Sequence, residues 1–208
     1  MPVFDAILFD FDGVIMDSEP VHFACWREVL LPLGVRLEWD YYLTHGIGID
    51  DKLMLQQLVG DSRDWRELWS QYPAKKELFR SRMLASPPFP ENLGALLADL
   101  HAAYRLAIVS SSSSSEIEPL VERAGLRRYF STIVGGDHVT RHKPAPEPYL
   151  LAAERLAVRS PLVIEDSEAG AAAGRAAGFP VLQIRHPSEL EPALRARLSD
   201  VRTHTAES

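Results

Sequence analysis

The chain has 208 residues, of which 46% are hydrophobic and 25% charged, so its composition is that of an ordinary globular protein able to bury a sizeable core. Its formal net charge of -7 argues against nucleic acid or an anionic membrane surface as a partner. The single cysteine, Cys25, excludes an internal disulfide, and its apolar neighbours predict a buried thiol rather than a nucleophile.

The N-terminus and the apolar segments predict a soluble, cytoplasmic protein. Asp5 and Asp10 interrupt the first apolar run, which also lacks a basic start, so a signal peptide is not expected. No apolar stretch approaches the roughly 20 residues that a membrane-spanning helix needs. We expect a monomer or a weak dimer.

In chain order, the first predicted elements are one strand and a long helical segment. Val3–Phe9 is predicted to be a short buried strand that ends at the turn Asp10–Gly13. From residue 18 to about residue 84, apolar and aromatic residues recur at steps of three and four, which is typical of helices with a common core. The proline-rich run Pro87–Pro90 predicts a linker after this segment.

Apolar strands alternate with helices in the rest of the chain, which predicts right-handed crossovers and a parallel sheet. The predicted strands are Arg105–Val109, Thr132–Val134, Leu162–Ile164 and Val181–Ile184. The predicted helices are Leu93–Ala102, Glu116–Ala124, Pro146–Leu156, Ala169–Ala177 and about Ser188–Leu198, and Ser199–Ser208 is expected to fray.

These elements predict an α/β fold with a discontinuous organisation. A Rossmann-like core, a parallel sheet with helices on both faces, would be made from residues 1–17 and 87–208. An all-helical domain, residues 18–86, would be inserted just after the first strand.

Polar side chains follow several of the predicted strands. Asp10 and Asp12 follow the first strand, Ser110 follows the second, and Glu165 and Asp166 follow the fourth. In open parallel sheets, ligands bind at the carboxyl ends of the strands. We therefore expect these side chains to lie on one rim of the sheet.

Carboxylates gathered on one rim repel one another unless a cation holds them. Hard oxygen ligands favour Mg²⁺, and the chain has no His/Cys cluster with zinc spacing. A neutralised aspartate can attack phosphorus and form an aspartyl-phosphate, while a carboxylate two residues on exchanges protons with the leaving group and with water. Lys143, in the loop beyond the third strand, would offset charge on the transferred phosphoryl group.

Four motifs carry a resemblance that covers nearly the whole chain. They are Asp10-Phe11-Asp12-Gly13-Val14-Ile15, then Ser110 after Leu106-Ala107-Ile108-Val109, then Lys143-Pro144-Ala145-Pro146-Glu147, and Ile164-Glu165-Asp166-Ser167 with Ala169-Gly170. With these four motifs in this order, the chain resembles the haloacid dehalogenase superfamily. The resemblance is to its phosphatase and phosphomutase branch, which has a helical cap after the first motif.

The resemblance implies a role for each matching residue. Asp10 would be the nucleophile and a metal ligand, and Asp12 would be the general acid/base and a ligand through its backbone carbonyl. Ser110 would bind the phosphoryl oxygens, and Lys143 would pair with Asp10 and the phosphoryl group. Asp166 and Glu165 would complete the Mg²⁺ shell, partly through water.

The resemblance also implies that residues 18–86 form a mobile cap that closes over the substrate. The candidate substrate-binding residues are His22, His45, Gly46 and Lys76 in the cap and Ser111 in the core. His22 fits a surface histidine equally well, and the glycine-rich loop around His45 could be a plain connector. Lys75 and Lys76 could reach substrate from the cap, although their pattern favours a solvated face.

One departure from the family bears on the reaction. Phosphomutases of this branch carry a cap arginine that grips the distal phosphate, but that position aligns with Ile49, and no arginine lies between Arg36 and Arg63. The sequence therefore favours an Mg²⁺-dependent phosphatase for a small phosphorylated metabolite, a sugar phosphate or a phosphoglycolate-like compound. The alternatives are a β-phosphoglucomutase-like enzyme and a phospho-acceptor module without turnover.

Overall fold

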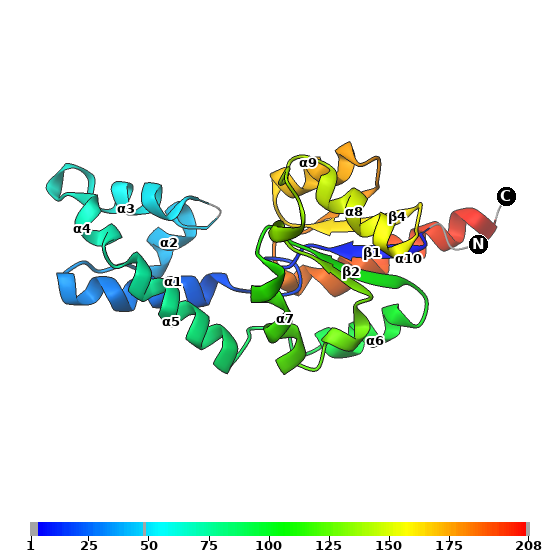
Figure 1. Ribbon diagram of the computed structural model, residues 1–208, viewed down its shortest axis with the longest axis horizontal. Coiled ribbons are helices and arrows are strands. Elements are labelled where there is room, and N and C mark those ends of the chain that lie inside the picture. Colours follow the sequence, from blue (N-terminus) through cyan, green and yellow to red (C-terminus); the bar gives the residue numbers. More distant parts are fainter. Residues whose placement is uncertain (1–3, 48, 207–208) are drawn as a thin grey trace. The chain divides into compact units, whose positions relative to one another are not determined.

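The computed structural model describes residues 4–47 and 49–206, and the chain divides into two compact units. The core unit comprises Met1–Asp17 and Pro88–Ser208, and the helical unit is Ser18–Pro87 (Figure 1). The backbone N–H of Asp17 donates to the Pro88 carbonyl at 3.1 Å. This hydrogen bond connects the two segments of the core unit at the place where the helical unit is inserted. Pro87, which the prediction placed in the core, groups with the helical unit.

A parallel sheet of five strands forms the centre of the core unit in the part of the chain that the structure describes. The strands are β1 (Ala6–Phe9), β2 (Arg105–Val109), β3 (Thr132–Val134), β4 (Pro161–Glu165) and β5 (Val181–Gln183). Their order is β3-β2-β1-β4-β5, and each neighbouring pair is parallel. The order reverses between β1 and β4, which is the place where open sheets of this kind bind ligands.

Helices cover both faces of this sheet, so β1 and β4 are buried along their whole length. Helices α8 (Glu147–Leu156) and α9 (Glu168–Ala176) lie on one face, and α6 (Leu93–His101), α7 (Ser114–Arg123) and α10 (Leu190–Ala206) lie on the other (Figure 1). The predicted α/β fold is confirmed.

Helix ends differ from the prediction by one or two residues in most cases, and two larger or better explained differences have local reasons. Helix α7 begins at Ser114, before the predicted Glu116, because the Ser113 hydroxyl accepts a hydrogen bond from the Ser115 N–H and caps the helix. Helix α10 continues to Ala206, so fraying from Ser199 is wrong as far as this residue, since no glycine or proline interrupts the helix there. Residues 207–208, and Val3 of the first predicted strand, lie outside the described residues.

Helices make up the regular structure of the helical unit in its described residues. They are α1 (Glu19–Leu30), α2 (Trp39–His45), α3 (Asp51–Val59), α4 (Trp65–Trp69) and α5 (Tyr72–Ala85). Apolar side chains from these helices form a common core, as the helical periodicity predicted. Its buried residues are Trp26, Leu30, Leu37, Tyr42, Met54, Leu55 and Leu68. Cys25 is buried, as predicted. Across the described residues of both units, no helix has the length and apolar character needed to cross a membrane.

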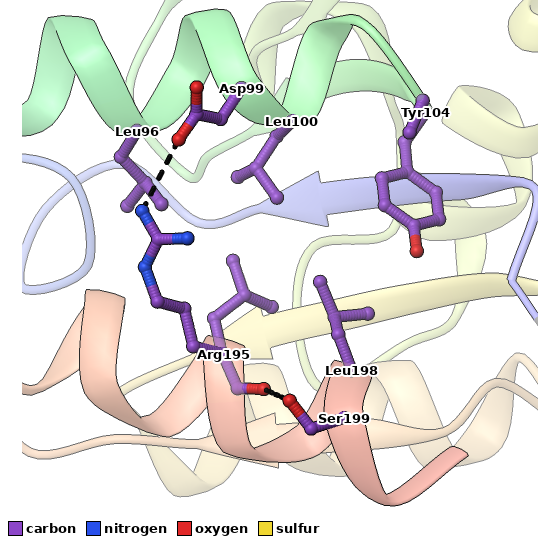
Figure 2. A pocket seen from close by; sticks show the side chains of 9 residues that line it. Leu96, Asp99, Leu100, Tyr104, Arg195, Leu198 and Ser199 are labelled. Atoms are coloured by element: carbon purple, nitrogen blue, oxygen red, sulfur yellow. Dashed lines mark hydrogen bonds and ion pairs between the residues drawn. The ribbon is translucent and has the colours of Figure 1, made fainter. Parts of the chain in front are cut away.

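A pocket of about 270 Å³ opens between α6 and α10 in the core unit (Figure 2). Four leucines line it: Leu96, Leu100, Leu194 and Leu198. Arg195 and Asp99 form an exposed ion pair at 3.3 Å beside it. The residues that carry the predicted chemistry belong to other segments of the core unit.

Candidate active site

The carboxyl edge of the sheet brings together the residues that the sequence singled out. Asp10 directly follows β1, Ser110 directly follows β2, and Glu165 is the last residue of β4. Because β1 pairs in parallel with both β2 and β4, the residues at these three strand ends lie side by side. Asp10 and Ser110 are 8% and 4% exposed, so both are buried polar groups.

Lys143 lies between two buried carboxylates. Its Nζ donates to Asp10 Oδ1 at 2.5 Å and to Glu165 Oε1 at 2.6 Å. It also donates to the Val109 carbonyl at 3.0 Å. The Lys143 side chain is 6% exposed and that of Glu165 is 0% exposed, so these ion pairs act where water screens them little. One ammonium group is thus shared by two anions.

Asp166 adds a third carboxylate to this group. One oxygen from each of Asp10, Glu165 and Asp166 lies within 4.8 Å of the others. Burial raises the pKa of Asp10 to about 8, although Lys143 opposes the rise. Burial and the charge of Glu165 raise the pKa of Asp166 to about 6. The cluster therefore carries more negative charge than Lys143 can offset, and its oxygen donors fit a divalent metal ion.

Both oxygens of Glu165 already have hydrogen-bond donors. Oε1 accepts from Lys143 Nζ and, at 2.6 Å, from the hydroxyl of Tyr149. Oε2 accepts from the Asp166 N–H at 3.2 Å, the Ser167 N–H at 3.3 Å and the Ser167 hydroxyl at 3.0 Å. A carboxylate has about four lone-pair positions, so these donors occupy them. Glu165 therefore has little capacity left to bind a metal ion directly.

Two glycines are needed where the backbone approaches these carboxylates. Gly13 has a φ of +77°, and a Cβ there would lie 2.1 Å from Asp166 Oδ2. A Cβ at Gly170 would lie 1.8 Å from Glu165 Oε1. Gly13 therefore lets the first motif pack against the fourth, and Gly170 lets the fourth motif fold closely around its own Glu165.

The serine-rich segment after β2 contacts Asp12. The Ser112 hydroxyl lies 3.4 Å from Asp12 Oδ2, and the Ser112 N–H donates to Ser110 Oγ at 3.1 Å. Ser111 is exposed, and its carbonyl would lie 2.4 Å from a Cβ at Gly136. The segment is thus a loop at the strand end that is held by hydrogen bonds and close packing.

Lys75 in the helical unit occupies a buried position that the sequence did not predict. It is 3% exposed, and its Nζ lies 2.8 Å from His22 Nδ1 and 3.1 Å from Asp51 Oδ2. Burial and the charge of Lys75 lower the pKa of His22 to about 4. The prediction of a solvated face is wrong for Lys75, because Asp51 balances its charge and the Trp26 ring lies 5.2 Å away. His22 is half-buried rather than a surface histidine.

His45, Gly46 and Lys76 have ordinary structural surroundings. The His45 ring stacks on Tyr41 at 4.4 Å, and its Nδ1 lies 3.2 Å from the Tyr41 carbonyl. A Cβ at Gly46 would lie 2.4 Å from the ring of Tyr42, so packing explains this glycine. Lys76 is exposed, as expected. The roles of these residues in substrate binding stay predictions.

Sequence reasoning missed Tyr149. It stands at an apolar position of the predicted helix Pro146–Leu156, which indicates burial but not a partner for its hydroxyl. The partner, Glu165, lies 16 residues further along the chain. A tyrosine at a core position is itself the available signal, since buried hydroxyls need a hydrogen-bond partner.

The chain matches the haloacid dehalogenase-like hydrolase family over residues 7–184. The fructose-1-phosphate phosphatase YqaB of Escherichia coli (strain K12) is 34% identical over 182 residues, which cover 86% of this chain and 95% of that protein. A phosphoglycolate phosphatase of Aquifex aeolicus is 30% identical, covering 83% of this chain and 80% of that protein. The crystal structure of a candidate β-phosphoglucomutase from Thermotoga maritima is 25% identical and has a TM-score of 0.73, covering 93% of this chain and 99% of that chain. The chain therefore belongs to the haloacid dehalogenase-like hydrolase family and is, as predicted, a phosphoric monoester hydrolase.

Proposed function

We propose that the chain is an Mg²⁺-dependent phosphatase that hydrolyses a small phosphorylated metabolite, a sugar phosphate or a phosphoglycolate-like compound. The observation that carries this proposal is the buried Lys143 held between Asp10 at 2.5 Å and Glu165 at 2.6 Å, with Asp166 in the same carboxylate cluster. The names of the relatives, a fructose-1-phosphate phosphatase and a phosphoglycolate phosphatase, support the substrate class.

In the first step, a carboxylate oxygen of Asp10 would attack phosphorus while the ester P–O bond breaks. Asp12 would donate a proton to the leaving oxygen, so that an alcohol departs. Lys143 and Ser110 would stabilise the charge on the phosphoryl oxygens. Asp10, Asp166 and the Asp12 carbonyl would hold Mg²⁺, which as a Lewis acid supplies further stabilisation of this charge.

In the second step, water would attack the phosphorus of the aspartyl-phosphate. Asp12, ionised by the first step, would take the proton from this water. The bond between the Asp10 oxygen and phosphorus would break, which releases inorganic phosphate and restores Asp10. The nucleophile must be ionised to start the cycle, and its pKa of about 8 without a metal ion indicates why a metal ion would be needed at neutral pH.

Two positions in the helical unit, Lys75 and Ile49, favour hydrolysis over phosphoryl transfer between two sugar positions. A phosphomutase must hold a second phosphoryl group, which needs a cation. Lys75 already pairs with Asp51 at 3.1 Å. The position that aligns with the phosphomutase arginine is Ile49.

The test is phosphate release from a panel that includes fructose 1-phosphate, other sugar phosphates and phosphoglycolate, with Mg²⁺ and with chelator. We expect metal-dependent release that disappears in Asp10→Asn, with thermal unfolding as the check that the variant is folded. Release that persists in Asp10→Asn would refute the mechanism. Conversion of β-glucose 1-phosphate to glucose 6-phosphate without net release would favour a mutase, and slow self-phosphorylation without turnover would favour an acceptor module.

A further inference from the structure

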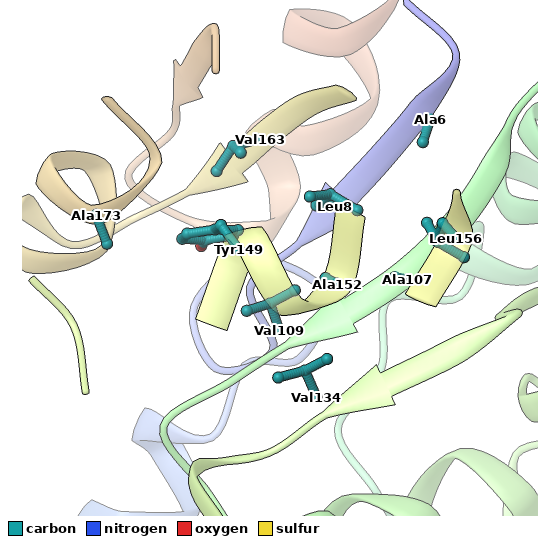
Figure 3. Close-up of a cluster of buried hydrophobic side chains, with 10 residues drawn as sticks. All are labelled: Ala6, Leu8, Ala107, Val109, Val134, Tyr149, Ala152, Leu156, Val163 and Ala173. Atoms are coloured by element: carbon teal, nitrogen blue, oxygen red, sulfur yellow. The ribbon is translucent and has the colours of Figure 1, made fainter. Parts of the chain in front are cut away.

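The phenol of Tyr149 lies in the apolar core of the unit yet contacts the candidate active site. Tyr149 is 0% exposed and packs with Leu8, Val109 and Val163 on the α8 face of the sheet (Figure 3). Its hydroxyl donates to Glu165 Oε1 at 2.6 Å. Burying a hydroxyl costs free energy unless it is hydrogen-bonded, and phenylalanine would satisfy packing alone. The hydroxyl therefore points to a role at Glu165.

A continuous chain of buried hydrogen bonds connects this hydroxyl to the nucleophile. Glu165 Oε1 accepts from both Tyr149 and Lys143, and the same Lys143 Nζ donates to Asp10 Oδ1. The Lys143 Nζ also lies 5.1 Å from the centre of the Tyr149 ring. Tyr149 thus contacts both Lys143 and Glu165, the ion pair next to Asp10, although Tyr149 itself lies in the apolar core.

We propose that Tyr149 is a positioning residue of this active site, whose hydroxyl shares Glu165 Oε1 with Lys143 so that the ammonium group stays available to Asp10. Without the phenolic donor, Lys143 would be the remaining donor to Oε1 and would be drawn toward Glu165. The catalytic consequence rests on the proposed function.

The same contact bears on the carboxylate cluster. The Asp166 N–H donates to Glu165 Oε2 at 3.2 Å, so a shift of Glu165 would also displace Asp166. Asp166 and Asp10 are the cluster members expected to contact a metal ion directly. Partners behind metal ligands commonly change metal affinity or activity by about 10- to 100-fold when they are removed. Metal affinity therefore reports on Tyr149 independently of turnover.

The variant Tyr149→Phe keeps the ring, its packing and its contact with Lys143 but removes the hydroxyl. We expect kcat to fall about tenfold or more while KM for the phosphate ester changes little. We also expect the Mg²⁺ affinity of the substrate-free protein, measured by titration calorimetry, to fall about tenfold.

Leu156→Val is the matched control, because Leu156 belongs to the same helix and the same buried cluster and loses only packing. Thermal unfolding of both variants corrects for lost stability. A loss of kcat or of Mg²⁺ affinity beyond that of Leu156→Val would support the proposal, and values equal to the control in both measurements would overturn it. A wild-type protein without phosphatase activity would refute the proposed function and would leave the Mg²⁺ titration to decide the role of Tyr149.

Discussion

Each unit of the molecule buries a lysine, and the two lysines differ in what surrounds them. In the core unit, Lys143 contacts two carboxylates, Asp10 and Glu165, whose side chains are 11% and 0% exposed. In the helical unit, Lys75 contacts Asp51, whose side chain is 29% exposed, and the neutral imidazole of His22. The first arrangement has a surplus of anions, and the second is balanced.

This difference separates a cluster that suits the proposed chemistry from a cluster that holds helices together. Burial disfavours the ionised form of both carboxylates and the charge of Glu165 adds to this effect, so the pKa of Asp10 rises to about 8 and that of Asp166 to about 6. Carboxylates in such surroundings bind protons or a cation. A balanced pair among aromatic rings needs no further ligand. The Lys75 cluster therefore joins α1, α3 and α5, whereas the Lys143 cluster suits the phosphoryl transfer that we propose.

The largest effect expected from this comparison is that of Lys143→Met. The substitution would leave Asp10 and Glu165 buried without their cation, which costs about 3–5 kcal/mol of unfolding free energy when one partner of a buried pair is removed. Loss of a group that stabilises transition-state charge would lower kcat by about 10²- to 10³-fold. Denaturant unfolding and phosphate release check both values. A variant with wild-type activity would show that Lys143 has only a structural role.

Lys75→Met is expected to act on stability alone. It removes hydrogen bonds to Asp51 and His22, which we expect to cost about 1–3 kcal/mol of unfolding free energy. The Mg²⁺ affinity of the substrate-free protein should not change, because the carboxylate cluster belongs to the other unit. A clear fall in Mg²⁺ affinity would contradict the distinction between the two lysines.

Gly13→Ala tests how closely the first motif approaches the carboxylate cluster. Both Gly13 and Gly178 have positive φ, +77° and +80°, so alanine at either position should cost about 1–2 kcal/mol. At Gly178 a Cβ meets nothing within 4 Å, whereas at Gly13 it would lie 2.1 Å from Asp166 Oδ2. We therefore expect a lower Mg²⁺ affinity in Gly13→Ala but not in Gly178→Ala. Equal affinities in calorimetry would refute the close approach.

The smallest effect concerns the dependence of Mg²⁺ stabilisation on pH. The pKa of Asp166 rises from 3.8 to about 6 on folding. Between pH 3.8 and about pH 6, the folded protein therefore binds more protons at this group than the unfolded chain does. The stability contributed by this group is thus present below pH 3.8 and is lost as pH rises through about 6. Mg²⁺ competes with these protons, so the rise in Tm that saturating Mg²⁺ causes should grow from pH 4 to pH 8.

His22 affects the pH dependence of stability in the opposite direction and serves as an internal control for this measurement. Its pKa falls to about 4 on folding, so its stabilising contribution is lost as pH falls from its usual value of 6.5 toward 4, with or without metal. Thermal scans of the metal-free protein, with and without added Mg²⁺, separate the two groups. A Tm increase from Mg²⁺ that stays constant over this range would contradict proton competition at the carboxylate cluster.

The sequence by itself determined the fold and which residues stand at the strand ends. Alternating apolar runs and helical periods are local patterns, and so are the four motifs that carry Asp10, Ser110, Lys143 and Glu165. Local patterns set secondary structure and the edge of the sheet at which a side chain emerges.

The tertiary structure decided most of the hydrogen-bond and ion-pair partners of the buried polar side chains. Lys143 and Glu165, whose contact the sequence did not predict, are 22 residues apart, and Lys75 and His22 are 53 residues apart. The contact of Tyr149 with Glu165 likewise joins a helix to a strand end. Hydrogen bonds between such distant residues depend on how the elements pack, and whether a lysine is solvated or buried follows from that packing rather than from its neighbours in the chain.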